Sequence, residues 1–88
     1  MNLIQLLDHL AWAFPTLSVG LGTHVGGSKY LYILVPKSDI RIYVQPSFKK
    51  TDRFEIIDPD SDLTLHPALE WSEVLPLVRM ELRSMVER

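Results

Sequence analysis

The sequence contains no cysteine among its 88 residues, which excludes disulfide frameworks, thiol catalysis and cysteine-ligated zinc sites. No apolar run approaches the roughly 18 residues of a membrane-spanning helix, so we expect no membrane partner. The four glycines and six prolines are too few for a low-complexity or collagen-like segment. These absences leave an ordinary globular domain as the class to consider.

Length and composition predict a single compact domain over residues 1–88. Hydrophobic residues make up 47% of the chain and charged residues 23%, as in typical globular domains. A chain of this size buries only about 60–65% of the surface that its unfolded form exposes. We therefore expect one small core of modest stability.

Charge is scarce in the first third of the chain and unevenly signed afterwards. Residues 1–28 contain one charged side chain, Asp8; residues 29–55 carry six basic against three acidic residues, and residues 56–76 carry five acidic residues alone. With a net charge of −2, the chain makes a weak electrostatic case for duplex DNA, and single-stranded nucleic acid stays open. The apolar N-terminus has no Lys or Arg in front of it and is interrupted by Asp8 and His9, so we expect no cleaved signal peptide and a cytoplasmic protein.

Hydrophobic periodicity predicts an α+β fold: an N-terminal helix, an antiparallel β-meander of three to five strands, and a C-terminal helix packed on the sheet. The expected elements are a helix over 3–14, strands over 17–21, 29–35, 40–44 and 53–57, a short fifth strand over 63–65, and a helix over 71–86. Each helix has an apolar face that we expect to be buried against the sheet. These faces comprise Leu3, Ile4, Leu6, Leu7, Leu10, Ala11, Ala13 and Phe14 in the first helix, and Trp71, Val74, Leu75, Val78, Leu82, Met85 and Val86 in the second.

The start of the last helix is ambiguous because Pro76 follows closely. A proline in a helix interior costs roughly 3 kcal/mol. We expect Ser72 to cap the helix; the other interpretation is an earlier helix that begins at Pro67 and kinks at Pro76.

Two motif-like segments are interpreted as turns. Residues 22–29, GTHVGGSK, have the glycine spacing of a phosphate loop, but a strand-like run follows where such a loop must open a helix. Residues 58–62, DPDSD, begin like a calcium loop, but Leu63 replaces the required glycine and the closing acid comes one residue late, as Glu70. We expect a hairpin loop and a solvated acidic turn, with no cofactor at either.

No catalytic constellation is evident. The three histidines, His9, His24 and His66, share no short metal-ligand spacing. We therefore expect a protein that is not an enzyme and binds neither metal nor cofactor.

The strongest functional signal is a predicted surface of the sheet. If the turn over 36–39 closes a hairpin, one face carries apolar pairs such as Ile33 with Ile42, and the other pairs Tyr32 with Tyr43. Tyrosine and arginine are enriched at protein interfaces. The expected anchors are Tyr30, Tyr32, Arg41 and Tyr43, with the neighbouring loop residues Phe48, Lys49 and Lys50. The competing interpretation is that the second helix covers this face and makes it a second core layer.

The sequence thus predicts a small protein-binding module, a regulator, adaptor or inhibitor that occupies the surface of another protein, with a homodimer as one arrangement. The alternative is single-stranded nucleic-acid binding, with tyrosines stacking on bases and Lys49, Lys50 and Arg53 meeting phosphates. A third hypothesis is a metal- or phosphate-dependent enzyme that uses His24 or His66.

Overall fold

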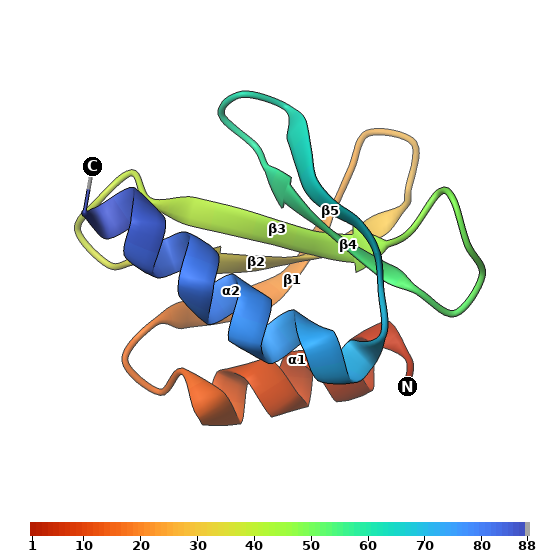
Figure 1. Cartoon of the computed structure of the whole chain (residues 1–88), viewed down its shortest axis with the longest axis horizontal. Helices are drawn as coiled ribbons and strands as arrows, with labels where there is room; N and C mark the ends of the chain where they lie inside the picture. The colour runs from red at the N-terminus through yellow and green to blue at the C-terminus, as the bar shows by residue number, and fades with distance from the viewer. Residues whose placement is uncertain (88) are drawn as a thin grey trace.

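A computed structural model describes residues 1–87 (Figure 1). The chain forms two helices and five strands, in the predicted order. They are α1 (Leu3–Ala13), β1 (Ser18–Thr23), β2 (Lys29–Leu34), β3 (Arg41–Pro46), β4 (Phe54–Asp58), β5 (Leu63–Leu69) and α2 (Trp71–Val86). The predicted α+β fold class is confirmed.

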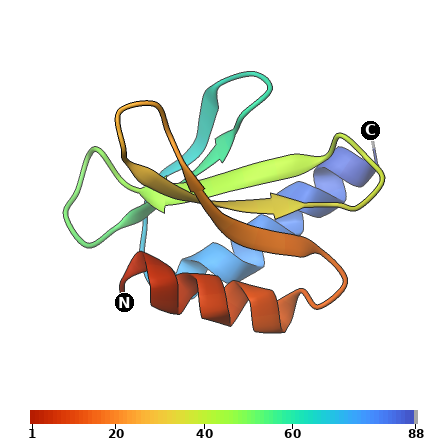
Figure 2. The same ribbon diagram turned by 180° about the vertical axis from the view of Figure 1, so that it is seen from behind.

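The strands form one antiparallel sheet in the order β1-β2-β3-β4-β5, so each strand pairs with its neighbour in sequence. Both helices lie on the same side of this sheet, α1 beneath β1 and β2, and α2 beneath the strands from β3 to β5 (Figures 1 and 2). The other side of the sheet is left uncovered by either helix. The interpretation that α2 covers the tyrosine face is therefore wrong.

The register of the β2–β3 hairpin follows the prediction. Ile33 pairs with Ile42, and Tyr32 pairs with Tyr43. Because side chains alternate between the two faces of a strand, this register places the isoleucines toward the helices and the tyrosines on the uncovered face.

The core lies between the sheet and the two helices. Its fully buried members from the strands are Leu31, Ile33, Ile42, Val44 and Ile56, and those from the helices are Leu6, Leu10, Val74 and Val78. Within residues 1–87, neither helix has the length and hydropathy needed to cross a bilayer.

Local capping explains where the helices begin. The Asn2 side chain accepts from the Gln5 amide and the Gln5 side chain accepts from the Asn2 amide, both at 2.9 Å, which forms a capping box. Helix α2 is capped by Glu70 and contains Pro76 in its second turn. The predicted range 71–86 is confirmed, whereas the predicted cap at Ser72 and the alternative start at Pro67 are wrong. The Glu73 carboxylate accepts from the Glu70 amide at 3.0 Å and supports the earlier start.

Two further predictions need correction. Strand β5 continues to Leu69 where a short strand over 63–65 was expected. Not every apolar helical residue is buried, because Ile4 is 58% exposed and Val86 is also 58% exposed; Ala11 and Trp71 are exposed as well. Only the stripe of each helix that faces the sheet lies within the core.

Candidate functional site

The uncovered face of the sheet holds the predicted anchors on three adjacent strands. Alternation along the strands directs Gly20 and Gly22 of β1, the tyrosines of β2, and Tyr43 of β3 to this face. We call this surface, with the hairpins beside it, the open-face groove. Its floor is aromatic, because three partly exposed tyrosines lie on it and the rings of Tyr30 and Tyr32 extend over the glycines of β1.

The two glycines of β1 make room for tyrosine rings. Gly22 pairs with Tyr30 and Gly20 pairs with Tyr32. A Cβ atom added at Gly22 would lie 2.4 Å from Tyr30 Cζ, and one added at Gly20 would lie 2.3 Å from the Tyr32 hydroxyl oxygen. Each ring therefore covers the backbone of the neighbouring strand, at positions where any larger residue would displace it.

The rings continue into a stack across the groove. Tyr30 stacks on Tyr43 with ring centroids 4.3 Å apart, and His24 contacts Tyr30 at the same separation. The Arg41 guanidinium carbon lies 6.0 Å from the centroid of the Tyr43 ring, at the outer range of a cation–π contact. Interaction with the Tyr43 side chain raises the pKa of Tyr30, and burial adds to this rise. The raised pKa keeps the Tyr30 ring neutral at physiological pH.

A line of hydrogen bonds crosses one end of the groove. Gln45 Nε2 donates to Glu55 Oε2 at 3.1 Å, which leaves Gln45 Oε1 as the acceptor toward His24 Nε2, 2.8 Å away. Nε2 of His24 must therefore carry a hydrogen. The other Glu55 oxygen accepts from the Phe48 amide at 2.9 Å. These bonds connect the β1–β2 loop, two strands and the β3–β4 loop, and they fix the groove wall next to Phe48.

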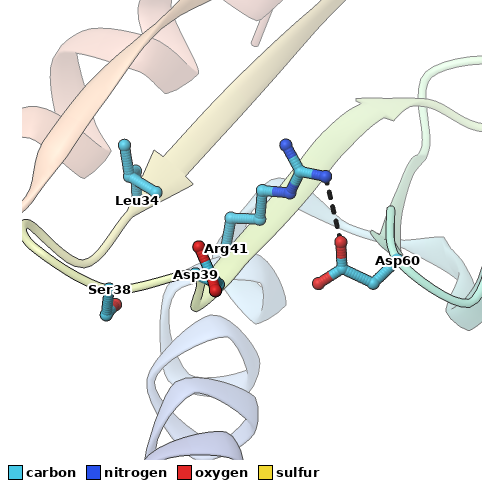
Figure 3. Close-up of a pocket in the computed structure, with 5 residues that line it drawn as sticks. All are labelled: Leu34, Ser38, Asp39, Arg41 and Asp60. Atoms are coloured by element: carbon cyan, nitrogen blue, oxygen red, sulfur yellow. Dashed lines mark hydrogen bonds and ion pairs between the residues drawn. The ribbon is translucent and has the colours of Figure 1, made fainter.

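At the opposite end, Arg41 of β3 reaches toward Asp60 of the β4–β5 hairpin (Figure 3). Its Nη2 atom lies 2.9 Å from Asp60 Oδ1, and this bond raises the pKa of Arg41. Both side chains are largely exposed. The pair connects the hairpin to the floor, and it neutralises the cation that was expected to meet a partner directly.

Two cavities lie along this face. One, of about 380 Å³, is lined by Leu34, Ser38, Asp39, Arg41 and Asp60 (Figure 3). The second, of about 340 Å³, is lined by His24, Ser28, Tyr43, Gln45, Phe48, Ile57, Pro59 and Asp62. The β1–β2 and β4–β5 hairpin loops rise beside the open face in both views (Figures 1 and 2). Both cavities border the β4–β5 hairpin, the first through Asp60 and the second through Pro59 and Asp62.

The loops around the groove expose apolar side chains. Val25 at the tip of the β1–β2 loop and Phe48 in the β3–β4 loop are almost fully exposed, the latter at 87%. Large apolar side chains at two loops beside an aromatic floor are typical of a surface that contacts another molecule.

The charge of the lining is acidic. Asp39, Asp60 and Asp62 line the cavities, whereas Arg41 is the basic residue among the lining side chains and is already paired with Asp60. Lys49 and Lys50 are exposed in the β3–β4 loop but line neither cavity. The basic excess of residues 29–55 therefore does not gather in the groove.

The structure brings together Tyr30, Tyr32, Arg41, Tyr43 and Phe48 of the predicted anchors, and it leaves Lys49 and Lys50 at the side. The predicted anchors did not include four residues of this face and its hairpins: His24, Gln45, Glu55 and Asp60. Strict alternation over 53–57 is the signal that could have placed Glu55 on the tyrosine face. No sequence signal pairs Arg41 with Asp60, because the contact depends on how far the β4–β5 hairpin rises.

The motif-like segments form turns, as predicted. Residues 22–29 close the β1–β2 hairpin and open β2; Gly26 and Gly27 have φ values of +103° and +99°, which favour glycine. Residues 58–62 form the turn between β4 and β5. His9, His24 and His66 lie against Trp71, Gln45 and Glu81, respectively, and among residues 1–87 no three potential metal-ligating side chains of His, Asp or Glu are clustered.

Comparison with protein-family models, with curated proteins and with solved structures finds no match to this chain.

Proposed function

We propose that the chain is a small, non-enzymatic protein-binding module that holds a segment of another protein in the open-face groove. The observation that carries this proposal is the position of the tyrosine stack. It lies on a sheet face that neither helix covers, between two raised hairpins. A regulator, adaptor or inhibitor that works by occupying a partner's surface needs such a face.

The aromatic floor supports protein binding through its chemistry. Tyrosine rings bury a large apolar area while the hydroxyl keeps a hydrogen bond, so they serve as rigid anchors at interfaces. Stacking between Tyr30 and Tyr43, and packing of Tyr30 and Tyr32 over glycines, fix these rings before binding. A fixed ring loses little conformational entropy when a partner docks.

The charge of the groove favours a particular kind of segment. Three aspartates line the cavities, and the one lining cation is neutralised by Asp60. A partner segment that combines apolar side chains for the floor with lysine or arginine for Asp39 and Asp62 would complement this surface.

The same charge argues against single-stranded nucleic acid, the alternative function. Phosphates would meet Asp39, Asp60 and Asp62, while Lys49 and Lys50 lie outside both cavities. Binding of a strand depends on basic side chains along its path together with stacking. The groove offers aromatic rings on which bases could stack, but it lacks the row of basic side chains that a phosphate backbone needs.

A selection of random peptides displayed on phage tests the proposal. We expect the immobilised chain to enrich peptides that contain aromatic or aliphatic residues together with Lys or Arg. Tyr43→Ala should weaken the binding of an enriched peptide at least about tenfold if Tyr43 is a hot spot. The matched control is Trp12→Ala, because Trp12 is 86% exposed on α1, away from the groove, and should leave the affinity unchanged.

Circular dichroism and urea unfolding of both variants keep the result interpretable, because a loss of binding counts only for a variant that remains folded. Equal loss in Tyr43→Ala and Trp12→Ala, or enrichment of peptides whose binding ignores Tyr43, would refute the groove as the site. Tyr43-dependent binding of a single-stranded oligonucleotide with steep salt dependence would establish the alternative function.

A further inference from the structure

The outer edge of β1 is an open row of backbone hydrogen-bonding groups. His24 N–H donates to the Ser28 carbonyl at 2.8 Å, and hydrogen-bonded and non-bonded pairs alternate along an antiparallel ladder. Gly20 and Gly22 therefore bond to β2. Val19, Leu21 and Thr23 direct their N–H and C=O groups away from the sheet.

This edge carries none of the features that normally prevent strands from pairing. Over Ser18–Thr23 there is no proline, no charged residue and no register shift against β2. The opposite edge is different, because β5 contains Pro67 and pairs with β4 through register shifts. Exposed edges are usually protected by such irregularities, so the regular β1 edge is available for a further strand.

The side chains along the edge also allow a close approach. On the groove face, β1 contributes Ser18, Gly20 and Gly22, and the rings of Tyr30 and Tyr32 already cover the two glycines. On the helix face lie Val19, Leu21 and Thr23, with Leu21 40% exposed. An approaching strand would meet backbone and mostly apolar side chains; the charged group near this edge is the Lys29 ammonium, which donates to Thr23 Oγ1 at 2.9 Å at one end of β1.

Helix α1 extends this apolar surface below the edge. His9 contacts Trp71 of α2 with ring centroids 5.8 Å apart, so it marks the flank of α1 that faces α2. Ile4, Leu7 and Ala11 lie about half a turn away around the helix. Since α1 packs beneath β1, their flank faces the β1 edge, which accounts for the exposure of Ile4 and Ala11.

From these features we infer that the β1 edge binds the β1 edge of a second copy of the chain, so that the two sheets join antiparallel about a two-fold axis near Leu21. In a two-fold contact each residue near the axis meets the same or a neighbouring residue of its partner. A charged edge would therefore repel itself. Between residues 1 and 28 Asp8 is the single charged side chain, and the Lys29 ammonium on Thr23 lies at the end of the edge, away from the axis. The two copies therefore bring no like charges together at Leu21.

This register uses the whole edge. Leu21 pairs with Leu21 of the second copy, and Val19 pairs with Thr23, each pair exchanging two backbone hydrogen bonds. The glycines oppose one another on the groove face, and α1 of each copy brings its apolar flank beside the other. The two open-face grooves would then lie on one continuous sheet. The inference does not depend on what binds in the groove.

Sedimentation velocity and light scattering test the oligomeric state directly. We expect the wild-type chain to be a dimer at micromolar concentration. Leu21→Lys places two ammonium groups opposite each other at the axis and should raise the dimer dissociation constant at least about tenfold. Met80→Lys is the matched control, because Met80 is 50% exposed on α2, and this variant should remain dimeric.

Single-cysteine variants provide a second measurement that does not depend on the folding of Leu21→Lys. The chain has no cysteine, so Leu21→Cys introduces one thiol per copy. Directly opposed residues in a hydrogen-bonded antiparallel pair lie about 5.5 Å apart at Cα, within the range of a disulfide. Mild oxidation should cross-link Leu21→Cys much faster than Met80→Cys.

A wild-type chain that is monomeric at hundreds of micromolar would overturn the inference and leave the edge open to a strand of another protein. A dimer that persists in Leu21→Lys, or equal cross-linking of Leu21→Cys and Met80→Cys, would overturn it as well, because the dimer would then form through another surface.

Discussion

Replacing Gly22 by alanine should disturb the stacking of Tyr30 on Tyr43. The size of the energy loss follows from the contact between the added Cβ atom and the Tyr30 ring. The added Cβ would lie 2.4 Å from Tyr30 Cζ, whereas carbon atoms in contact need about 3.5–4.0 Å. The ring must therefore move by about 1 Å or more. That movement reduces stacking on Tyr43, where an aromatic pair contributes about 0.5–1.5 kcal/mol.

The Gly22→Ala substitution also has a stabilising effect, which must be separated from the loss of stacking energy. Alanine is favoured over glycine in a strand by about 0.5–1 kcal/mol, because glycine loses more backbone entropy on folding. In a Tyr30→Ala background, where the ring is gone, Gly22→Ala should stabilise the chain by that amount. A double-mutant cycle should thus show a coupling energy of about 1–2 kcal/mol between the two positions.

Urea unfolding monitored by circular dichroism measures all four proteins of the cycle. Gly20→Ala is the comparison, because within residues 1–87 Tyr32 has no stacked aromatic partner, and its ring can rotate away at lower cost. We expect a coupling with Tyr32→Ala of about 0.5 kcal/mol or less. If Gly22→Ala changes the free energy of unfolding equally with and without the Tyr30 ring, the ring does not pack over Gly22 in the groove floor.

Two further predictions concern α2 and the tyrosine hydroxyls. Pro76→Ala should raise the free energy of unfolding by about 1–3 kcal/mol, since alanine restores an amide able to donate to the Ser72 carbonyl; a thermal melt that is unchanged would contradict this. Because the Tyr43 side chain raises the pKa of Tyr30 above its ordinary value of 10.0, the neutral form is the one that folding favours. The contribution of Tyr30 to stability is therefore present below the unfolded pKa and lost as pH rises through the folded one. Titration of tyrosinate absorbance should show one late group that disappears in Tyr30→Phe, whereas three groups that titrate together would refute it.

The pattern of apolar and turn residues along the chain was sufficient to predict most of the helices and strands. Clean alternation over 40–44, with a four-residue turn between this strand and the apolar run over 29–35, was sufficient to predict the pairing of Tyr32 with Tyr43, because a one-residue slip would expose the isoleucines. The capping residue of α2 was not predictable in this way. Glu70 is a weak cap by type, and its role depends on the Glu73 carboxylate and on Arg53, 3.3 Å from Glu70 Oε1.

By itself the sequence determined which side chains share a face of each strand, since that depends on a period of two residues along the chain. It could not decide which face the helices cover. That choice rests on where α1 and α2 cross the sheet, and thus on contacts between residues far apart in the chain, such as His9 with Trp71. Only the tertiary structure left the tyrosines uncovered, paired Arg41 with Asp60, and placed the apolar flank of α1 beside the unpaired edge of β1.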